Sequence, residues 1–285
     1  MLSITIPGVS ADLSKPFRKR DPLCSGDNDG VRFLFDTAFR WCYPDGTATA
    51  SKSVRDVAER ADSSLTVIAG NPIPLVGNGL DFSGITVPGT FVGVPASVMA
   101  DLFAEQLFLI CFYMTAPASA DWLIGTRCLF QGSAAPSSYV TTPDIGMLGF
   151  GGGSNSIIAR RQTSVGNYIG LSVSPGTVNA YGKLTQVAMW RTADEFGLRL
   201  KTVDGQTSQT AAAGAKDTAD FSTGVGAFGV PKGFWTVAGL TTDELKAVKF
   251  RLHRGFVENL ARSTRKPVEV LDADWARQIK RAVFN

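Results

Sequence analysis

The 285-residue sequence predicts a mainly β protein built as one two-sheet antiparallel jelly-roll sandwich, with a few short helices and a C-terminal helix. The chain holds 30 Gly and 14 Pro among frequent Val, Thr and Ser, which is typical of short strands joined by tight turns. Hydrophobic residues make up 44% and charged residues 19%, an ordinary globular balance. Strand-length apolar runs recur without alternating helices, which favours a sandwich over a parallel sheet.

The beginning of the chain predicts an arm followed by a domain. Residues 1–30 carry three prolines, a basic cluster and a turn-rich end, and they show no periodicity. We expect them to form an N-terminal arm that anchors the chain to a neighbour. The apolar run Val31–Asp36 is then the first strand of a single domain that covers residues 31–285.

The centre of the domain is predicted from its longest apolar run. Leu107–Met114 is apolar throughout, as expected for a strand buried on both faces. The preceding segment Ser97–Gln106 is the main helical interruption, because Val98, Leu102 and Leu107 fall on one helical face. Further short strands are expected at Leu65–Ile68, Leu80–Phe82, Ile85–Val94, Thr126–Phe130, Ile145–Phe150, Ser156–Arg160, Tyr168–Val173, Thr177–Tyr181 and Gln186–Arg191.

Alternating patterns mark two later strands. Phe196–Val203 alternates apolar and polar residues, which predicts a half-exposed strand. Ser208–Ala219 is small and polar, and we expect a loop there. Lys246–His253 alternates strictly, so that its basic positions, including His253, are expected to face solvent.

The chain is expected to close with one amphipathic helix that begins near Asp274 and packs on the sandwich. Asp272 or Asp274 can accept backbone N–H bonds at its start. Basic residues near its end suit the negative end of the helix dipole. Its apolar stripe consists of Trp275, Ile279 and Val283.

Charge and apolar run lengths exclude two classes of partner. The formal net charge is only +3, and short basic runs occur only at Lys15–Arg20 and Arg262–Lys266, which argues against nucleic-acid binding. The longest apolar run is far shorter than the ~20 residues of a membrane helix. The segment Met1–Ser10 is short, uncharged and interrupted by proline, so we expect no secretory leader and synthesis in a cytoplasm.

The sequence also lacks the residues that catalysis requires, and we predict a protein that is not an enzyme and has no catalytic residues. His253 is the only histidine, and no Gly-x-Ser-x-Gly turn accompanies it. No strand carries the paired carboxylates of a glycosidase. The Gly-x-Gly-x-x-Gly match at Gly224–Gly229 is followed by turn residues, and we interpret it as a strand and turn.

Metal and cofactor binding are likewise not predicted. The four cysteines form no Cys-x-x-Cys pair, and Cys111 is expected to be a buried free thiol. Asp27–Gly30 is interpreted as a turn, because the later ligands of a calcium loop are absent. A structural calcium ion held by scattered loop carboxylates is left open.

Loop aromatics and amides are the candidate ligand contacts, because aromatic rings can stack on sugars. Trp190 and Trp235 are interpreted as core residues. The predicted carbohydrate-binding residues are Trp122, Tyr139, Asn155 and Tyr168.

Several motifs in order resemble the laminin-G-like, or concanavalin-A-like, jelly-roll family. Gly79–Gly84 is similar to an early "aLDFdG" strand and turn, and Cys128–Gly132 to "ilsqG". Gln186–Gly205 resembles "hhvavt…g.lrlyvdG". Tyr113 stands where the family's tryptophan is expected, and Glu195-Phe196-Gly197 replaces its "DG" hairpin. The resemblance implies the sandwich fold, while family members bind very different partners or none.

Single domains of this family with an N-terminal arm resemble those on bacteriophage virions. The resemblance implies a virion structural protein of a tail, baseplate or fibre, assembled in the host cytoplasm. Residues 1–30 would then contact other virion proteins, and a homo-oligomer, guessed to be a trimer, would display the lectin-like domain. The alternative is a carbohydrate- or receptor-binding module that attaches to a surface glycan of a bacterial host. A glycoside hydrolase is a third and distant alternative.

Overall fold

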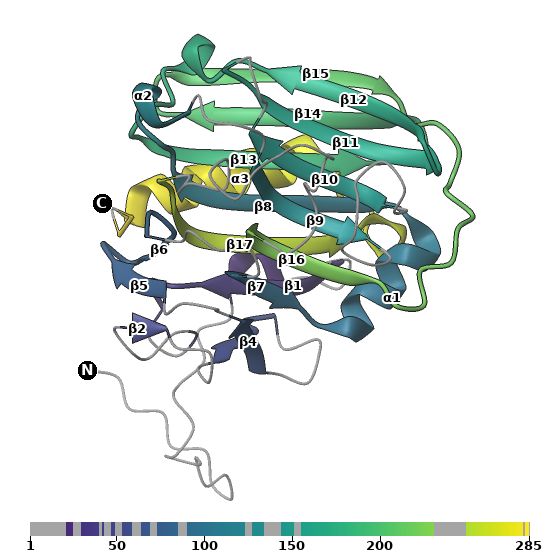
Figure 1. The fold of residues 1–285 in the computed structure, drawn as a ribbon, viewed down its shortest axis with the longest axis horizontal. Coiled ribbons are helices and arrows are strands. Elements are labelled where there is room, and N and C mark those ends of the chain that lie inside the picture. The colour runs from purple at the N-terminus through teal and green to yellow at the C-terminus, as the bar shows by residue number, and fades with distance from the viewer. Residues whose placement is uncertain are drawn as a thin grey trace, which may run out of the picture.

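The computed structural model describes residues 21–24, 30–39, 42, 47–48, 53–58, 64–68, 73–84, 90–122, 127–133, 144–150, 155–230, 249–281 and 283–284. These residues form two antiparallel sheets that pack face to face, with a helix near the C-terminus (Figure 1). The predicted fold class is therefore confirmed. Within the described ranges, no helix is both long enough and apolar enough to cross a membrane.

Nine strands make up the first sheet: β1 (Val31–Asp36), β2 (Thr47–Ala48), β5 (Ile73–Val76), β6 (Gly79–Asp81), β8 (Phe108–Thr115), β13 (Leu184–Arg191), β14 (Glu195–Thr202), β15 (Gly205–Ala212) and β17 (Arg251–Asn259). Their order is β15-β14-β13-β8-β17-β6-β5-β2, and β1 pairs with β17. The chain thus places β8 and β17, which are distant in sequence, side by side at the centre of this sheet.

Eight strands make up the second sheet: β3 (Ser53–Arg55), β4 (Ser64–Ile68), β7 (Thr90–Val94), β9 (Arg127–Ser133), β10 (Asp144–Phe150), β11 (Ile157–Ser164), β12 (Asn167–Val173) and β16 (Val225–Val230). Their order is β12-β11-β10-β9-β16-β7-β4-β3. The helices are α1 (Ala96–Glu105), α2 (Ser119–Trp122) and α3 (Pro267–Arg281), with 3-10 turns η1 (Pro22–Cys24), η2 (Pro175–Val178) and η4 (Leu260–Arg262).

Aromatic rings fill the space between the two sheets around Phe228 of β16. The rings of Phe33, Phe35 and Phe112 on the first sheet lie 6.3, 5.4 and 6.1 Å from it, centre to centre. Phe130 of β9 packs against Phe228 at 4.8 Å, with an angle of 61° between the rings. Tilted and edge-on contacts of this kind favour aromatic packing beyond the area they bury.

Strand β8 is buried on both faces, as its sequence predicts. Alternate residues point into the space between the sheets, and the residues between them point to the outer face, which α3 covers. A strand enclosed on both sides has no position for a solvent-facing polar residue. The inner set is Phe108, Ile110, Phe112 and Met114, and the outer set includes Leu109, Cys111 and Tyr113.

Helix α3 begins at Pro267, well before the predicted start at Asp274. Proline suits a first helical position, where its missing N–H needs no partner. Asp274 therefore lies inside the helix and caps nothing; it is buried and accepts a hydrogen bond from the Tyr113 hydroxyl at 2.8 Å. Asp272 likewise faces the sheet and pairs with Arg199 at 2.6 Å. Both aspartates dock the helix on the first sheet, so the predicted cap was wrong.

The predicted apolar stripe of this helix is confirmed only in part. Trp275 is buried, with its ring stacked 6.1 Å from that of Tyr113. Ile279 is exposed, and Val283 lies beyond the end of the helix. The stripe was displaced because the predicted start of the helix was too late.

Three other local predictions were wrong. The half-exposed strand at Phe196–Val203 is the nearly buried β14, because α3 covers its outer face and pairs with Arg199. The loop expected at Ser208–Ala219 begins within β15, an exposed edge strand paired with β14 over its whole length. Thr177–Tyr181 is not a strand, because the turn η2 starts at Pro175.

The last strand, β17, starts later than its alternating pattern suggested. Residues 246–248 lie outside the described residues, and β17 begins at Arg251. Its register with β8 shifts between Leu252 and Arg254, and such a bulge re-aims the side chains that follow it. His253 takes the outer face of the sheet, opposite to Leu252, but it does not face solvent: the Phe284 ring covers it at 5.2 Å between ring centres, and its Nε2 lies 2.8 Å from the Thr115 hydroxyl.

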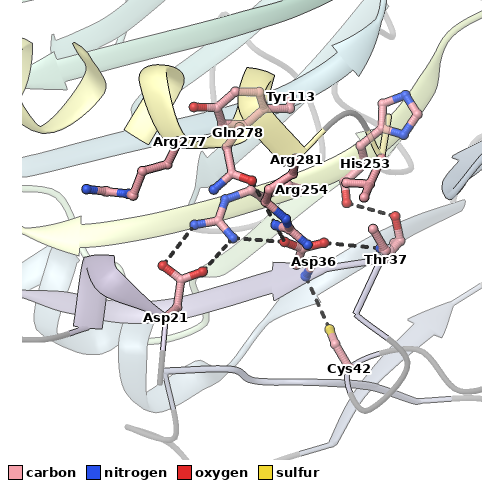
Figure 2. A network of polar contacts seen from close by, with 12 residues as sticks. Asp21, Asp36, Thr37, Cys42, Tyr113, His253, Arg254, Arg277, Gln278 and Arg281 are labelled. Carbon is pink, nitrogen blue, oxygen red and sulfur yellow. Dashed lines mark hydrogen bonds and ion pairs between the residues drawn. The ribbon is translucent and has the colours of Figure 1, made fainter. Parts of the chain in front are cut away.

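A buried ion network around Arg254 joins four elements (Figure 2). The Arg254 guanidinium donates to Asp21 at 2.9 and 3.2 Å, to Asp36 at 3.0 Å and to Asp274 at 3.2 Å. Burial alone would lower the pKa of Arg254, but the three carboxylates outweigh it and raise that pKa well above its usual value. The network thereby connects η1, β1 and α3 to β17. Asp21 belongs to the segment 1–30 predicted as an arm, of which residues 1–20 and 25–29 lie outside the described ranges.

Gly197 on β14 allows a close approach of the Trp190 ring from β13. The two residues are paired in register, and a Cβ atom at Gly197 would lie 2.1 Å from Cε2 of Trp190. The indole cannot easily move, because it is buried and its N–H donates to Glu195 at 2.7 Å.

Gly197→Ala is therefore expected to lower the free energy of unfolding by about 1–3 kcal/mol through overpacking. Urea unfolding followed by tryptophan fluorescence measures this loss. Gly84→Ala is the matched control, because a Cβ atom there meets nothing within 4 Å. Equal losses for the two variants would contradict the explanation.

Candidate functional site

Tyr168 of β12 is exposed on the outer face of the second sheet, beside two buried polar residues of β11, Arg160 and Gln162. Ala159 of β11 belongs to the core between the sheets, so its neighbours Arg160 and Gln162 point outward. Register places Gln162 opposite Tyr168 and Arg160 opposite Gly170. Tyr168 therefore shares the outer face with both polar residues of β11.

The Tyr168 ring is held flat against its neighbours and is open on its other side. The guanidinium carbon of Arg160 lies 3.9 Å from the ring centre, in cation–π geometry. Gly170 lies beside the ring, and a Cβ atom there would make an ordinary van der Waals contact with its edge at 3.6 Å. The residue nevertheless remains 57% exposed. The arrangement is a fixed aromatic platform that faces solvent.

Polar groups surround this platform at the β11–β12 hairpin. The Asn167 side chain donates to the Ser164 hydroxyl at 2.9 Å, and both residues are exposed. The turn between them contains Gly166 at φ 81°, a conformation that favours glycine. An exposed aromatic ring beside amide and hydroxyl groups can stack on the apolar face of a sugar and hydrogen-bond to its hydroxyls.

A buried carboxyl group lies deeper in the same sheet. Asp144 opens β10 opposite Ser133 of β9 and is fully buried. Burial raises the pKa of Asp144 to about 7, although the charge of Arg160 and the nearby polar groups of Gln162 act to lower it. The carboxyl group therefore titrates near neutral pH close to the residues that support Tyr168.

The four predicted carbohydrate-binding residues do not form one cluster among the described residues. Tyr168 is exposed as described above, whereas Trp122 is only 2% exposed and packs edge-on against Tyr181 at 5.5 Å. Asn155 is half-buried and precedes β11 at the end far from Tyr168, about 23 Å along the strand from Gln162. Tyr139 lies outside the described residues.

Sequence reasoning missed the partner that fixes Tyr168. Arg160 is one of two adjacent arginines in an otherwise apolar strand start, and this unusual pair was the available signal. Only the register of β11 against β12 shows that Arg160 lies under the ring.

The histidine and the cysteines whose side chains are described are all buried in the protein. Burial lowers the pKa of His253 to about 4, which keeps the ring neutral at physiological pH. Burial also raises the pKa of the Cys42 and Cys111 thiols well above their usual values. Cys111 is a buried free thiol, as predicted. The glycine motif that ends at Gly229 falls on β16, as interpreted.

The described residues contain no preformed cluster of metal ligands. No three His, Cys, Asp or Glu residues of the described ranges are placed together to hold an ion. Residues 25–29 and Trp235 lie outside those ranges. Trp190 is a core residue, as interpreted. Calcium binding and the absence of enzymatic activity stay predictions.

The fold defines the class of protein, a two-sheet antiparallel β sandwich. No protein-family model matches the sequence, and no curated protein matches it. Among solved structures, the botulinum neurotoxin serotype D binding domain is similar, with a TM-score of 0.55 and 10% identity over 88% of this chain and 53% of that one. A mutant of HCR D/C has a TM-score of 0.51 and 10% identity, covering 86% and 52%.

A third similar structure is CBM40 of the Ruminococcus gnavus IT-sialidase, with a TM-score of 0.45 and 11% identity over 68% of this chain and 95% of that one. This chain spans about half the length of the first two structures. At such identities, the first two likenesses show the sandwich fold alone.

Proposed function

We propose that this chain is a carbohydrate-binding module that attaches to a surface glycan through the outer face of β11 and β12. The observation that carries the proposal is the Tyr168 ring, which is fixed by Arg160 on one side and open to solvent on the other. Tyrosine is enriched among the residues that contribute most of the binding energy at interfaces.

The proposed contact is a sugar ring stacked on Tyr168. Asn167 and Ser164 lie on the hairpin beside it and offer an amide and a hydroxyl for sugar hydroxyl groups. One platform of this size gives a modest affinity. Several copies in a homo-oligomer, which is part of the proposal, would strengthen attachment to a repeating glycan by avidity.

Tyr168→Ala is expected to weaken glycan binding at least tenfold, because a hot-spot aromatic contributes more than about 1.4 kcal/mol. A glycan array identifies the ligand, and calorimetry with that ligand compares the variants. Tyr168→Phe keeps the platform and is expected to retain most of the affinity. Val203→Ala removes an exposed apolar side chain elsewhere and serves as the control. Unchanged binding in Tyr168→Ala would refute this site.

The setting on a bacteriophage virion is proposed from the sequence resemblance. In that setting, the part of residues 1–30 that precedes Asp21 contacts other virion proteins, since Leu23 and Cys24 are buried in the domain, and the module faces a bacterial host. Cross-linking within assembled particles, followed by identification of the linked peptides, examines this directly. A chain that is absent from particles would exclude the virion setting and leave the glycan proposal standing.

A further inference from the structure

A concave region lies on the opposite side of the sandwich from Tyr168, where α3 and η1 cover the first sheet. It is a pocket of about 420 Å³. Its apolar wall comes from Pro22, Phe39 and Val57, and its other wall comes from the last turns of α3. The volume falls in the range of small-molecule sites.

The carboxylates that line this pocket use most of their hydrogen-bonding capacity within the protein. Asp36 accepts through Oδ2 from Arg254 and Arg281, and through Oδ1 from the backbone N–H of Ala38. Asp21 accepts from Arg254 through both oxygens and from the Leu23 N–H through Oδ1. Each carboxylate thus accepts three hydrogen bonds, which leaves about one of its four acceptor positions for a ligand.

The cationic side chains of the pocket retain unused donors. Arg277 reaches Asp274 only at 3.6 Å, its side chain is 36% exposed, and it makes no hydrogen bond within the described part of the protein. Lys280 forms no ion pair there. Arg281 makes both of its hydrogen bonds through Nη1, which leaves its other nitrogens available (Figure 2).

The charges of the pocket lining also favour an anion. The lining carries three cations, Arg277, Lys280 and Arg281, and two carboxylates, Asp21 and Asp36, so that one positive charge is in excess among these lining residues. A partly enclosed site of low dielectric strengthens the attraction of that charge for a ligand.

We infer that this pocket binds a small organic carboxylate whose apolar face packs on Phe39 and Val57. The carboxylate would accept hydrogen bonds from Arg277 and Lys280, for which a planar guanidinium offers two-point contact. The pocket is built from other residues than the Tyr168 surface, so this inference does not depend on the proposed function.

Two matched pairs of probes test the inference by NMR titration of the whole chain. Glucuronate is compared with glucose, and benzoate with benzyl alcohol, so that each pair differs in the negative charge. We expect at least one of the anions to bind at least tenfold more tightly than its neutral partner. Preference for glucuronate alone identifies an acidic sugar as the ligand class, and preference for benzoate alone identifies an apolar acid.

Variants then locate the binding site. Lys280→Gln and Arg277→Gln are each expected to weaken anion binding at least fivefold, and high salt is expected to weaken it as well. Lys280 is exposed, so its replacement preserves the fold even if Arg277→Gln perturbs the helix. Lys249→Gln is the control, because that lysine pairs with Asp121 away from the pocket. Equal binding of both members in each pair, or unchanged affinity in Lys280→Gln and Arg277→Gln, would overturn the inference.

Discussion

Arg254→Met is expected to lower the free energy of unfolding by about 3–5 kcal/mol, the usual cost of removing one partner from a buried ion pair. The Arg254 side chain is fully buried, and its guanidinium is shared by Asp21, Asp36 and Asp274. Methionine restores volume but supplies no donor. At least Asp36 and Asp274, whose side chains are 3% and 0% exposed, would keep a charge with too few partners.

Urea unfolding at pH 7 measures the loss. Lys183→Met is the matched control, because it breaks the pair with Asp204, whose two side chains are 36% and 40% exposed. Exposed pairs contribute at most about 1 kcal/mol. Adding Asp274→Asn to Arg254→Met is expected to recover part of the stability, since it removes one uncompensated charge. Similar losses in Arg254→Met and Lys183→Met would show that the network does not carry this stability.

This network also marks the limit of what the sequence predicts. The strands β1 and β8 follow from local apolar runs, which need no knowledge of distant residues. The partners of Arg254 lie 20, 218 and 233 positions away, and only the packed fold brings them together. Strand β17 also carries Arg251, His253 and Glu258, so Arg254 does not stand out in the sequence, and nothing local identifies its carboxylates.

The same difference between local pattern and distant partners explains which local predictions were correct and which were wrong. Helix α3 was placed too late because Asp274 has the residue type of a cap, whereas its partners Tyr113 and Arg254 lie on the sheet. His253 was expected in solvent because alternation predicts only which face of the strand a side chain takes, and Phe284 from the end of the chain covers that face. At the candidate site, the exposure of Tyr168 was predictable from its polar hairpin, but the stacking of Arg160 required the register of β11.

Asp144→Asn is expected to make the protein more stable at pH 8 than the wild type, by a margin that disappears toward pH 4. Folding raises the pKa of Asp144 from 3.8 to about 7, mainly through burial. The folded state therefore binds the proton more tightly than the unfolded state. Its stabilising contribution is complete below pH 3.8 and is lost as the pH rises through about 7. At 1.36 kcal/mol per unit of pKa, the ionised carboxyl group costs on the order of 4 kcal/mol at pH 8.

Urea unfolding at pH 4, 6 and 8 tests this expectation, because asparagine keeps the neutral form at every pH. The difference in unfolding free energy between Asp144→Asn and the wild type should grow steadily from pH 4 to pH 8. Asp204→Asn is the contrasting control: the hydrogen bond from Lys183 lowers the pKa of Asp204, so its replacement should remove stability above that pKa. A pH-independent difference for Asp144→Asn would mean that Arg160 and Gln162 compensate the buried charge fully. Asp144 would then be ionised in the folded protein at neutral pH, and the support of Tyr168 would include a permanent Asp144–Arg160 attraction.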